Sequence, residues 1–160
     1  MEASKRQVTL VQVAPTPTAV IVEATTWEAF PARWPEMLSE VWSYLRQAGL
    51  ETDRNVMLYR DDLPNVEVGV EVRRPFAPEG RVVPSSLPAG LAAKTIETGP
   101  PSPAGLAQAH AAVRAWCNAN HHELEGTRWE VYGHWREEQD PAEYETEVYW
   151  LLRENSRGRA

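Results

Sequence analysis

The sequence has few of the features that mark secreted, membrane or disulfide-rich proteins. Its 160 residues include one cysteine, Cys117, which excludes an internal disulfide and a zinc site built from cysteines. No apolar run approaches the roughly 20 residues of a membrane span, and Met1 to Arg6 lead into an alternating segment rather than a secretory signal. These absences predict one domain over residues 1–160, located in the cytoplasm and not associated with a membrane.

Positive charge is also scarce. The chain has 16 lysines and arginines against 23 aspartates and glutamates, a net charge of −7. Because nucleic-acid backbones bind to positive surfaces, we expect no direct binding of nucleic acid. An acidic surface is compatible with a cationic ligand, although solubility alone explains most acidic surfaces.

Motifs for cofactors, metals and nucleophilic catalysis are missing. No glycine-rich phosphate-binding pattern occurs, so nucleotide cofactors have no support. His121 and His122 are adjacent and would diverge, while His110 lies on an apolar helix stripe and is interpreted as a hydrogen-bonded core residue. Ser85-Ser86 is read as a loop without the strand-turn-helix setting of a nucleophile. We therefore expect no cofactor and no metal.

Aromatic residues are abundant instead. Seven tryptophans and five tyrosines favour a pocket that stacks flat ligands, with a simple core-filling role as the equal alternative. Their spacing suggests a duplication, since Trp42 and Tyr59 are 17 residues apart and Trp116 and Tyr132 are 16 apart. Internal repetition of this kind points to two copies of one structural unit.

Hydrophobic periodicity predicts the same order of elements in each copy, strand–helix–strand–strand. Repeat one, about 7–76, combines strands and one helix over 8–13, 19–23, 35–48, 56–59 and 66–72. Repeat two, about 81–153, does so over 91–97, 103–117, 129–135 and 146–152. Residues 154–160 are expected to form a flexible tail. The predicted fold is α+β, with two pseudo-symmetric repeats, antiparallel sheets and a ligand cleft between the repeats.

Four stretches resemble the GyrI-like family, the effector-binding domain of bacterial transcription regulators: Val66-Glu67-Val68-Gly69-Val70; Leu87-Pro88-Ala89-Gly90 with Thr98-Gly99-Pro100; Trp129-Glu130-Val131-Tyr132; and Thr146-Glu147-Val148-Tyr149. The resemblance implies a cleft for hydrophobic, often cationic aromatic compounds, with a buried glutamate that matches Glu147. Some stand-alone members act on DNA gyrase, and others resemble hydrolases. Pro101 stands where the family often has a cleft tyrosine. No recognition-helix pattern occurs, so we expect a stand-alone member.

Glu147 is the main candidate for the site. Alternation in the segment 146–152 puts Glu147, Tyr149 and Leu151 on one strand face. A buried carboxylate needs a partner, because an unpaired buried charge is costly. Three interpretations remain open: a counter-charge for a cationic ligand, a general acid or base, and an exposed or arginine-paired structural glutamate.

Aromatic side chains complete the predicted ligand site: Tyr149, Tyr132, Tyr59, Trp135, Trp42 and Trp116. Which face of 129–135 meets the cleft stays open, since Tyr132 shares a face with Glu130 while Trp135 lies on the other. Glu67 and Glu71 are expected on a solvated strand face, with a second carboxylate beside Glu147 as the alternative.

The predicted function is binding of hydrophobic, cationic or neutral aromatic small molecules for xenobiotic sensing or sequestration. One alternative is a hydrolase of strained-ring or electrophilic xenobiotics, with Glu147 as general acid or base and Tyr132 as a second catalytic residue. Another is an interaction protein whose partner is DNA gyrase. Whether the protein is an enzyme stays open.

Overall fold

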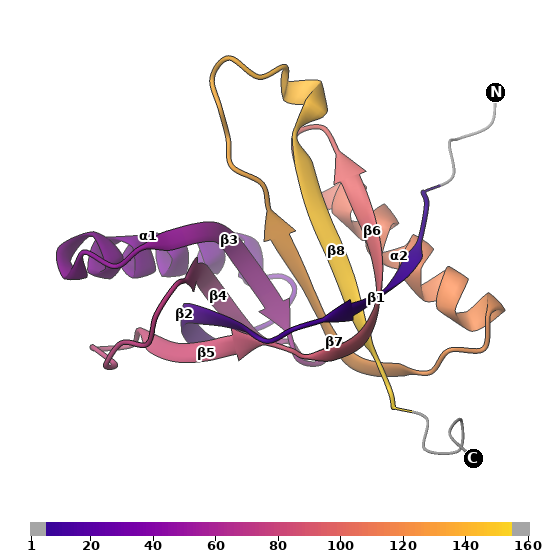
Figure 1. The fold of residues 1–160 in the computed structure, drawn as a ribbon, viewed down its shortest axis with the longest axis horizontal. Coiled ribbons are helices and arrows are strands. Elements are labelled where there is room, and N and C mark those ends of the chain that lie inside the picture. Colours follow the sequence, from indigo (N-terminus) through magenta and orange to yellow (C-terminus); the bar gives the residue numbers. More distant parts are fainter. Residues whose placement is uncertain (1–5, 155–160) are drawn as a thin grey trace.

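The computed structural model describes residues 6–154, which form eight strands and two long helices (Figure 1). The predicted tail therefore lies outside the described residues, except for Glu154. The elements follow in the order β1 (Thr9–Val13), β2 (Thr16–Ala24), α1 (Phe30–Ala48), β3 (Thr52–Tyr59), β4 (Asn65–Val72), β5 (Val83–Leu87), β6 (Gly90–Thr98), α2 (Pro103–Ala119), β7 (Leu124–Tyr132), the short 3-10 helix η1 (Pro141–Glu143) and β8 (Glu145–Leu152). The α+β prediction is confirmed.

All strands belong to one antiparallel sheet in the order β1-β6-β8-β7-β3-β4-β2-β5. The units β2-α1-β3-β4 and β6-α2-β7-β8 have the same connectivity and meet where β3 pairs with β7. At this junction Met57 lies opposite Glu130. The predicted arrangement of two pseudo-symmetric units is therefore confirmed, with its axis passing between two central strands.

The two edge strands of the sheet, β1 and β5, are each followed closely in the chain by a strand at the other edge region, β2 and β6 respectively. Thr9 lies opposite Lys94 in the β1–β6 pair, and Thr16 lies opposite Leu87 in the β2–β5 pair, so the register continues unchanged across both pairs. In Figure 1 β1 leads directly into β2, and β5 bends upward into β6. The sheet consequently curls. Strand β1, which precedes the first unit, pairs with β6 of the second, and β5, which precedes the second unit, pairs with β2 of the first.

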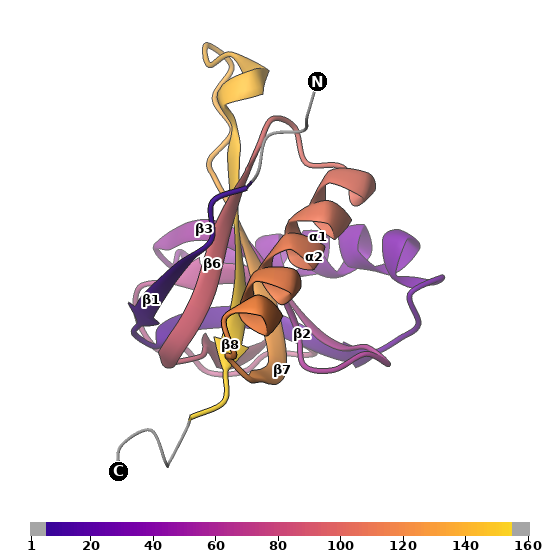
Figure 2. The same cartoon turned by 90° about the vertical axis from the view of Figure 1, so that its right-hand side faces the viewer.

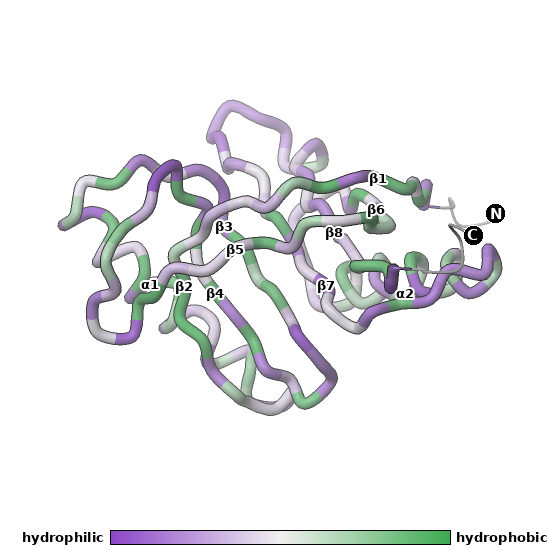
Figure 3. The backbone as a smooth tube through the Cα atoms, turned by 60° about the horizontal axis from the view of Figure 1, so that its bottom comes forward, coloured by the Kyte–Doolittle hydropathy of each residue, from purple (hydrophilic) through white to green (hydrophobic). Residues whose placement is uncertain are grey.

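Both helices pack on the same face of the sheet, each over its own unit (Figure 2). Helix α1 covers β2 and β4 with Met37, Val41 and Leu45, while α2 covers β6 and β8. The hydropathy colouring in Figure 3 shows hydrophobic stretches along strands and helices, separated by hydrophilic connections. Because each helix covers only the outer strands of its unit, β3 and β7 lie between the helices.

Local predictions were wrong for the Ser85-Ser86 segment and for both ends of strand β7. The Ser85-Ser86 segment is part of strand β5, although its polar residues and Pro84 are typical of a loop. Strand β7 begins at Leu124 and ends at Tyr132, so Trp135 lies beyond it. The first half of β7 contains several polar residues, so the apolar pattern predicted a start that is too late in the sequence. Within residues 6–154, neither helix has the length and hydrophobicity that a membrane span requires.

Candidate functional site

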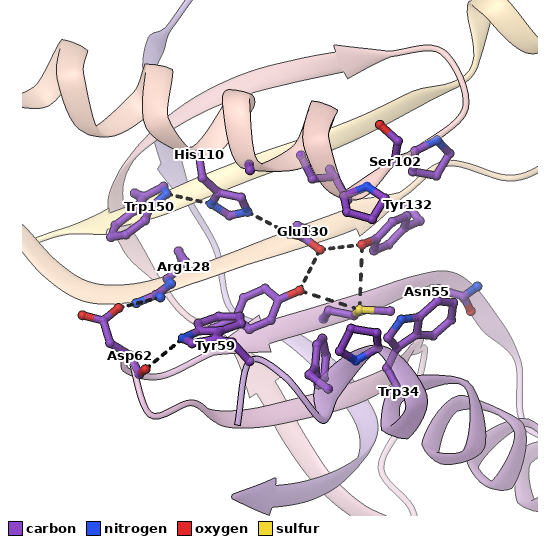
Figure 4. A pocket seen from close by; sticks show the side chains of 18 of the residues that line it. Trp34, Asn55, Tyr59, Asp62, Ser102, His110, Arg128, Glu130, Tyr132 and Trp150 are labelled. Atoms are coloured by element: carbon purple, nitrogen blue, oxygen red, sulfur yellow. Dashed lines mark hydrogen bonds and ion pairs between the residues drawn. The ribbon is translucent and has the colours of Figure 1, made fainter. Parts of the chain in front are cut away.

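A cleft of about 1080 Å³ lies over β3 and β7, between the two helices. Its floor carries alternate side chains of these two strands, and its walls come from the start of α1 and from α2 (Figure 4). Trp27, Phe30 and Trp34 form one wall, while Leu106 and His110 belong to the other. The floor is open because neither helix covers the central strands, so the duplication itself creates the cleft.

A buried carboxylate, Glu130, occupies the floor. Its exposed fraction is 3%. It accepts hydrogen bonds from the Tyr59 hydroxyl at 3.0 Å, the Tyr132 hydroxyl at 2.5 Å and the His110 Nε2 at 2.7 Å. Three donors from β3, β7 and α2 therefore converge on one side chain, as a buried carboxylate requires.

The hydrogen bonds of His110 assign its protonation. The indole Nε1 of Trp150 donates to the His110 Nδ1 at 2.9 Å. Since an indole N–H is only a donor, Nδ1 must be an acceptor, and the ring proton is on Nε2. The imidazole is then neutral and donates to Glu130. All three donors to Glu130 are neutral groups, so they solvate its charge without cancelling it.

The two tyrosines remain phenols. Burial raises the pKa of Tyr59 well above its ordinary value, and the charge of Glu130 raises it further. The same two causes, in the same order, raise the pKa of Tyr132. Deprotonation would place a second anion beside the carboxylate in a poorly solvated site. Both hydroxyls therefore stay protonated and keep their donor role.

Aromatic rings surround this polar centre. The Tyr59 ring lies 5.6 Å from the Trp27 ring and 5.7 Å from the Phe30 ring, with an edge-on arrangement to Phe30. The His110 ring lies 6.3 Å from it and 6.0 Å from the Trp150 ring. These distances fit the favourable range for aromatic pairs. The cleft thus combines an aromatic enclosure with one buried anion.

The comparisons with known proteins agree with this architecture. The family model of the GyrI-like small molecule binding domain matches residues 6–153. The chain belongs to the GyrI-like family. It is accordingly a small-molecule-binding domain, and the predicted family is confirmed. No curated protein matches the chain in sequence.

Solved structures share the fold of this GyrI-like domain. The C-terminal domain of EcmrR has a TM-score of 0.76 and 21% identity, with 94% of this chain and 99% of that chain covered. The structure of SAV2435 bound to tetraphenylphosphonium has a TM-score of 0.63 and 13% identity, with 92% and 94% covered. A hydrolase from Listeria innocua has a TM-score of 0.58 and 11% identity, with 94% of each chain covered. At these identities the likeness shows the fold alone.

Two of the predicted ligand-binding residues, Tyr59 and Tyr132, line the cleft. Glu147 and Tyr149 do not, and the predicted position of Glu147 in the cleft is wrong. In β8 the residues that pack toward α2 are Val148 and Trp150, and Trp150 lines the cleft. Alternation then turns Glu147 and Tyr149 to the opposite sheet face. Glu130 is the buried carboxylate that the cleft contains instead.

On that opposite face Glu147 is paired with neighbouring residues. It accepts a hydrogen bond from the Tyr149 hydroxyl at 2.6 Å, and its other oxygen lies 3.1 Å from the Arg54 Nη1 and 3.9 Å from the Lys94 Nζ. Burial opposes ionisation of Glu147, but the Tyr149 hydrogen bond and the charges of Arg54 and Lys94 outweigh it and lower the pKa. The arginine-paired arrangement is thus the one that the structure contains.

The solvated strand face expected for Glu67 and Glu71 is wrong. Both are buried, with exposed fractions of 5% and 6%, rather than solvated. Glu67 is paired with Arg60, and Glu71 accepts hydrogen bonds from the backbone and side chain of Arg54. Because Arg54 also binds Glu147, it lies between two carboxylates on the face opposite the cleft.

The three predicted tryptophans lie outside the main cleft. Trp42 and Trp135 line a smaller adjoining cavity of about 330 Å³, which shares Tyr132 with the main cleft. Trp42 donates a hydrogen bond to the Asn55 Oδ1 at 2.9 Å. Trp116 lines neither cavity and packs against the core below α2. The helix tryptophans therefore do not form matched walls of one site.

Glu130 and His110 line the cleft but were not predicted as cleft residues. A signal for Glu130 was present, because it shares a strand face with Tyr132, but that face was not assigned. His110 was correctly interpreted as hydrogen-bonded, although it also borders the cleft. Within the described part of the chain, no three histidine, cysteine, aspartate or glutamate side chains are grouped as a metal site would need.

Proposed function

We propose that this cytoplasmic domain binds hydrophobic organic cations in the cleft, with Glu130 as counter-charge, for xenobiotic sensing or sequestration. The observation that carries the proposal is a buried carboxylate whose three hydrogen-bond donors are all neutral. A ligand cation against Glu130 would place an opposite charge in direct contact with this almost fully buried carboxylate, where the attraction is stronger than at the surface.

The aromatic enclosure supports the same ligand class. A cation over an aromatic face gains about 0.5–2 kcal/mol, depending on how far it is desolvated. Tyr59, Trp27 and Phe30 offer such faces beside Glu130. The volume of about 1080 Å³ is at the upper end of pockets for drug-sized molecules. The neighbour SAV2435, solved with tetraphenylphosphonium, makes that cation a suitable probe.

The test is a titration of wild type, Glu130→Gln and Glu147→Gln with tetraphenylphosphonium, in which tryptophan fluorescence measures binding. Both substitutions remove one carboxylate charge, but only Glu130 lines the cleft. We expect Glu130→Gln to weaken binding at least tenfold, about 1.4 kcal/mol. Glu147→Gln should change it less than about twofold, which corresponds to under about 0.4 kcal/mol.

A neutral probe of similar shape, triphenylphosphine oxide, separates charge from hydrophobicity. Its binding should respond far less to Glu130→Gln than that of the cation. The absence of saturable binding of either probe would exclude the proposal. Equal weakening by Glu130→Gln and Glu147→Gln would exclude the role of Glu130.

A hydrolase is the second candidate, and the hydrogen bond between His110 and Glu130 beside the cleft favours it. Glu130 would accept a proton from a water molecule as the water oxygen bonds to a carbon of a strained ring; the ring bond at that carbon breaks, and the carbon that keeps its electron pair takes up the proton from Glu130. Three donors already occupy most of the acceptor positions of this carboxylate, which favours the binding role. Time-dependent consumption of an electrophilic aromatic compound by wild type, lost in Glu130→Gln, would instead support the hydrolase.

A further inference from the structure

The same strand that carries Glu130 also carries a buried cation. Arg128 lies two residues before Glu130, on the same face of β7, and both line the cleft (Figure 4). The strand rise puts their backbone positions roughly 7 Å apart. The Arg128 side chain is only 9% exposed. Within residues 6–154, the one ion pair of Arg128 is with Asp62 and not with Glu130. The cleft therefore contains two opposite charges that do not cancel by direct contact.

The ion pair between Arg128 and Asp62 is weak. Asp62 lies 2.7 Å from the Arg128 Nη2, but its own side chain is 89% exposed. An ion pair with such an exposed group is screened by water and salt. The guanidinium otherwise donates to the Gly126 carbonyl at 3.1 Å. A guanidinium has five N–H donors, so these two hydrogen bonds leave most of its donor capacity for another acceptor.

The surroundings of Arg128 concentrate positive charge at this end of the cleft. Its guanidinium lies 4.9 Å from the centre of the Trp150 ring, and that of Arg114 lies 5.5 Å from the same ring. Both arginines line the cleft, in a chain whose net charge is −7. Arg128 also lies over the rings of Trp27 and Tyr59, at 5.8 and 6.0 Å. A planar guanidinium held by aromatic rings is well suited to bind a carboxylate in a bidentate manner.

We propose that the cleft is bipolar and prefers zwitterionic aromatic ligands, with the cationic group against Glu130 and a carboxylate against Arg128. This inference rests on the proposed function of the same cleft and specifies its ligand class. A ligand carboxylate would replace or join the exposed Asp62 as the partner of Arg128. A purely cationic ligand would satisfy only the Glu130 end.

The test compares two dyes that differ in one group, rhodamine B, which has a free carboxylate, and its ethyl ester. Both have the same cationic aromatic system, and fluorescence anisotropy measures their affinities for the full chain. Wild type should bind the free acid at least tenfold more tightly than the ester. In Arg128→Gln this ratio should fall to within about twofold. Arg60→Gln is the matched control, because Arg60 does not line the cleft, and it should keep the preference.

A second variant should change the preference for the free acid in the opposite direction, and it replaces an exposed side chain. Asp62→Asn removes the competing carboxylate, so the preference for the free acid should increase by about threefold or more. This variant keeps the test decisive if Arg128→Gln does not fold.

The outcomes separate the two proposals. Failure of both dyes to bind would overturn the proposed function and this inference with it. Binding of the ester with equal or greater affinity than the free acid would overturn the bipolar cleft alone. The bipolar cleft would also be overturned by a preference that survives Arg128→Gln, or by one that Asp62→Asn leaves unchanged.

Discussion

The hydrogen bond from Tyr59 to Glu130 makes a quantitative prediction about stability. The Tyr59→Phe substitution removes one hydroxyl and leaves the ring in place. The hydroxyl lies 3.0 Å from the Glu130 Oε1, and the two residues are 6% and 3% exposed. The change therefore removes one of three donors from an almost fully buried carboxylate, with little change in packing.

The expected cost follows from the charge of the acceptor. A hydrogen bond to a charged group contributes about 1.5–3 kcal/mol, against about 0.5–1.5 kcal/mol for a neutral pair. Tyr59→Phe should therefore lower the free energy of unfolding by about 2 kcal/mol. In a Glu130→Gln background the same change should cost about 1 kcal/mol. The difference, a coupling of about 1 kcal/mol, is what direct contact within a hydrogen-bond network typically gives.

Urea unfolding of wild type, both single variants and the double variant measures the coupling. Tyr44→Phe is the matched control, because its hydroxyl makes an exposed hydrogen bond of 3.3 Å to the Ala77 carbonyl. It should change the free energy of unfolding by less than about 0.5 kcal/mol. Equal losses from Tyr59→Phe in both backgrounds would refute the view that Glu130 is charged and held by Tyr59.

Two further predictions concern parts of the sheet away from the cleft. Gly69→Ala should lower the free energy of unfolding, measured with urea, by about 3 kcal/mol or more, because its new Cβ would lie 1.9 Å from the backbone oxygen of Ala19. A loss under about 1 kcal/mol would contradict this prediction and would show that the backbone of β2 can shift at little cost. The second concerns Glu147, whose pKa is lowered from 4.5 because the Tyr149 hydrogen bond and Arg54 outweigh burial. A lowered pKa stabilises the fold above pH 4.5, and this contribution is lost as the pH falls below it. The stability deficit of Glu147→Gln should therefore be largest near neutral pH and should shrink in acid, whereas a constant deficit would contradict the assignment.

The fold was largely predictable because its elements are local patterns. Strict alternation over residues 66–72 indicated a strand, and β4 covers it. The helix predicted over residues 35–48 ends where α1 ends, and Gly49 adopts a left-handed conformation directly after it. Strand β5 was missed because Pro84 and two serines have low strand propensity, and pairing with β2 overrides it.

The functional site was less predictable, although its residue types were expected. The sequence determined that carboxylates and tyrosines alternate in two strands, which fixes the pairs Glu130 with Tyr132 and Glu147 with Tyr149 as sharing a face. It could not determine which pair faces the helices. Each of the two strands has apolar residues on both faces, because the curled sheet also has a core on the face away from the helices, so the apolar pattern alone does not separate the faces. Only the tertiary structure decides this, since the sheet register and the packing of α2 place Glu130 under the helices and Glu147 on the opposite side.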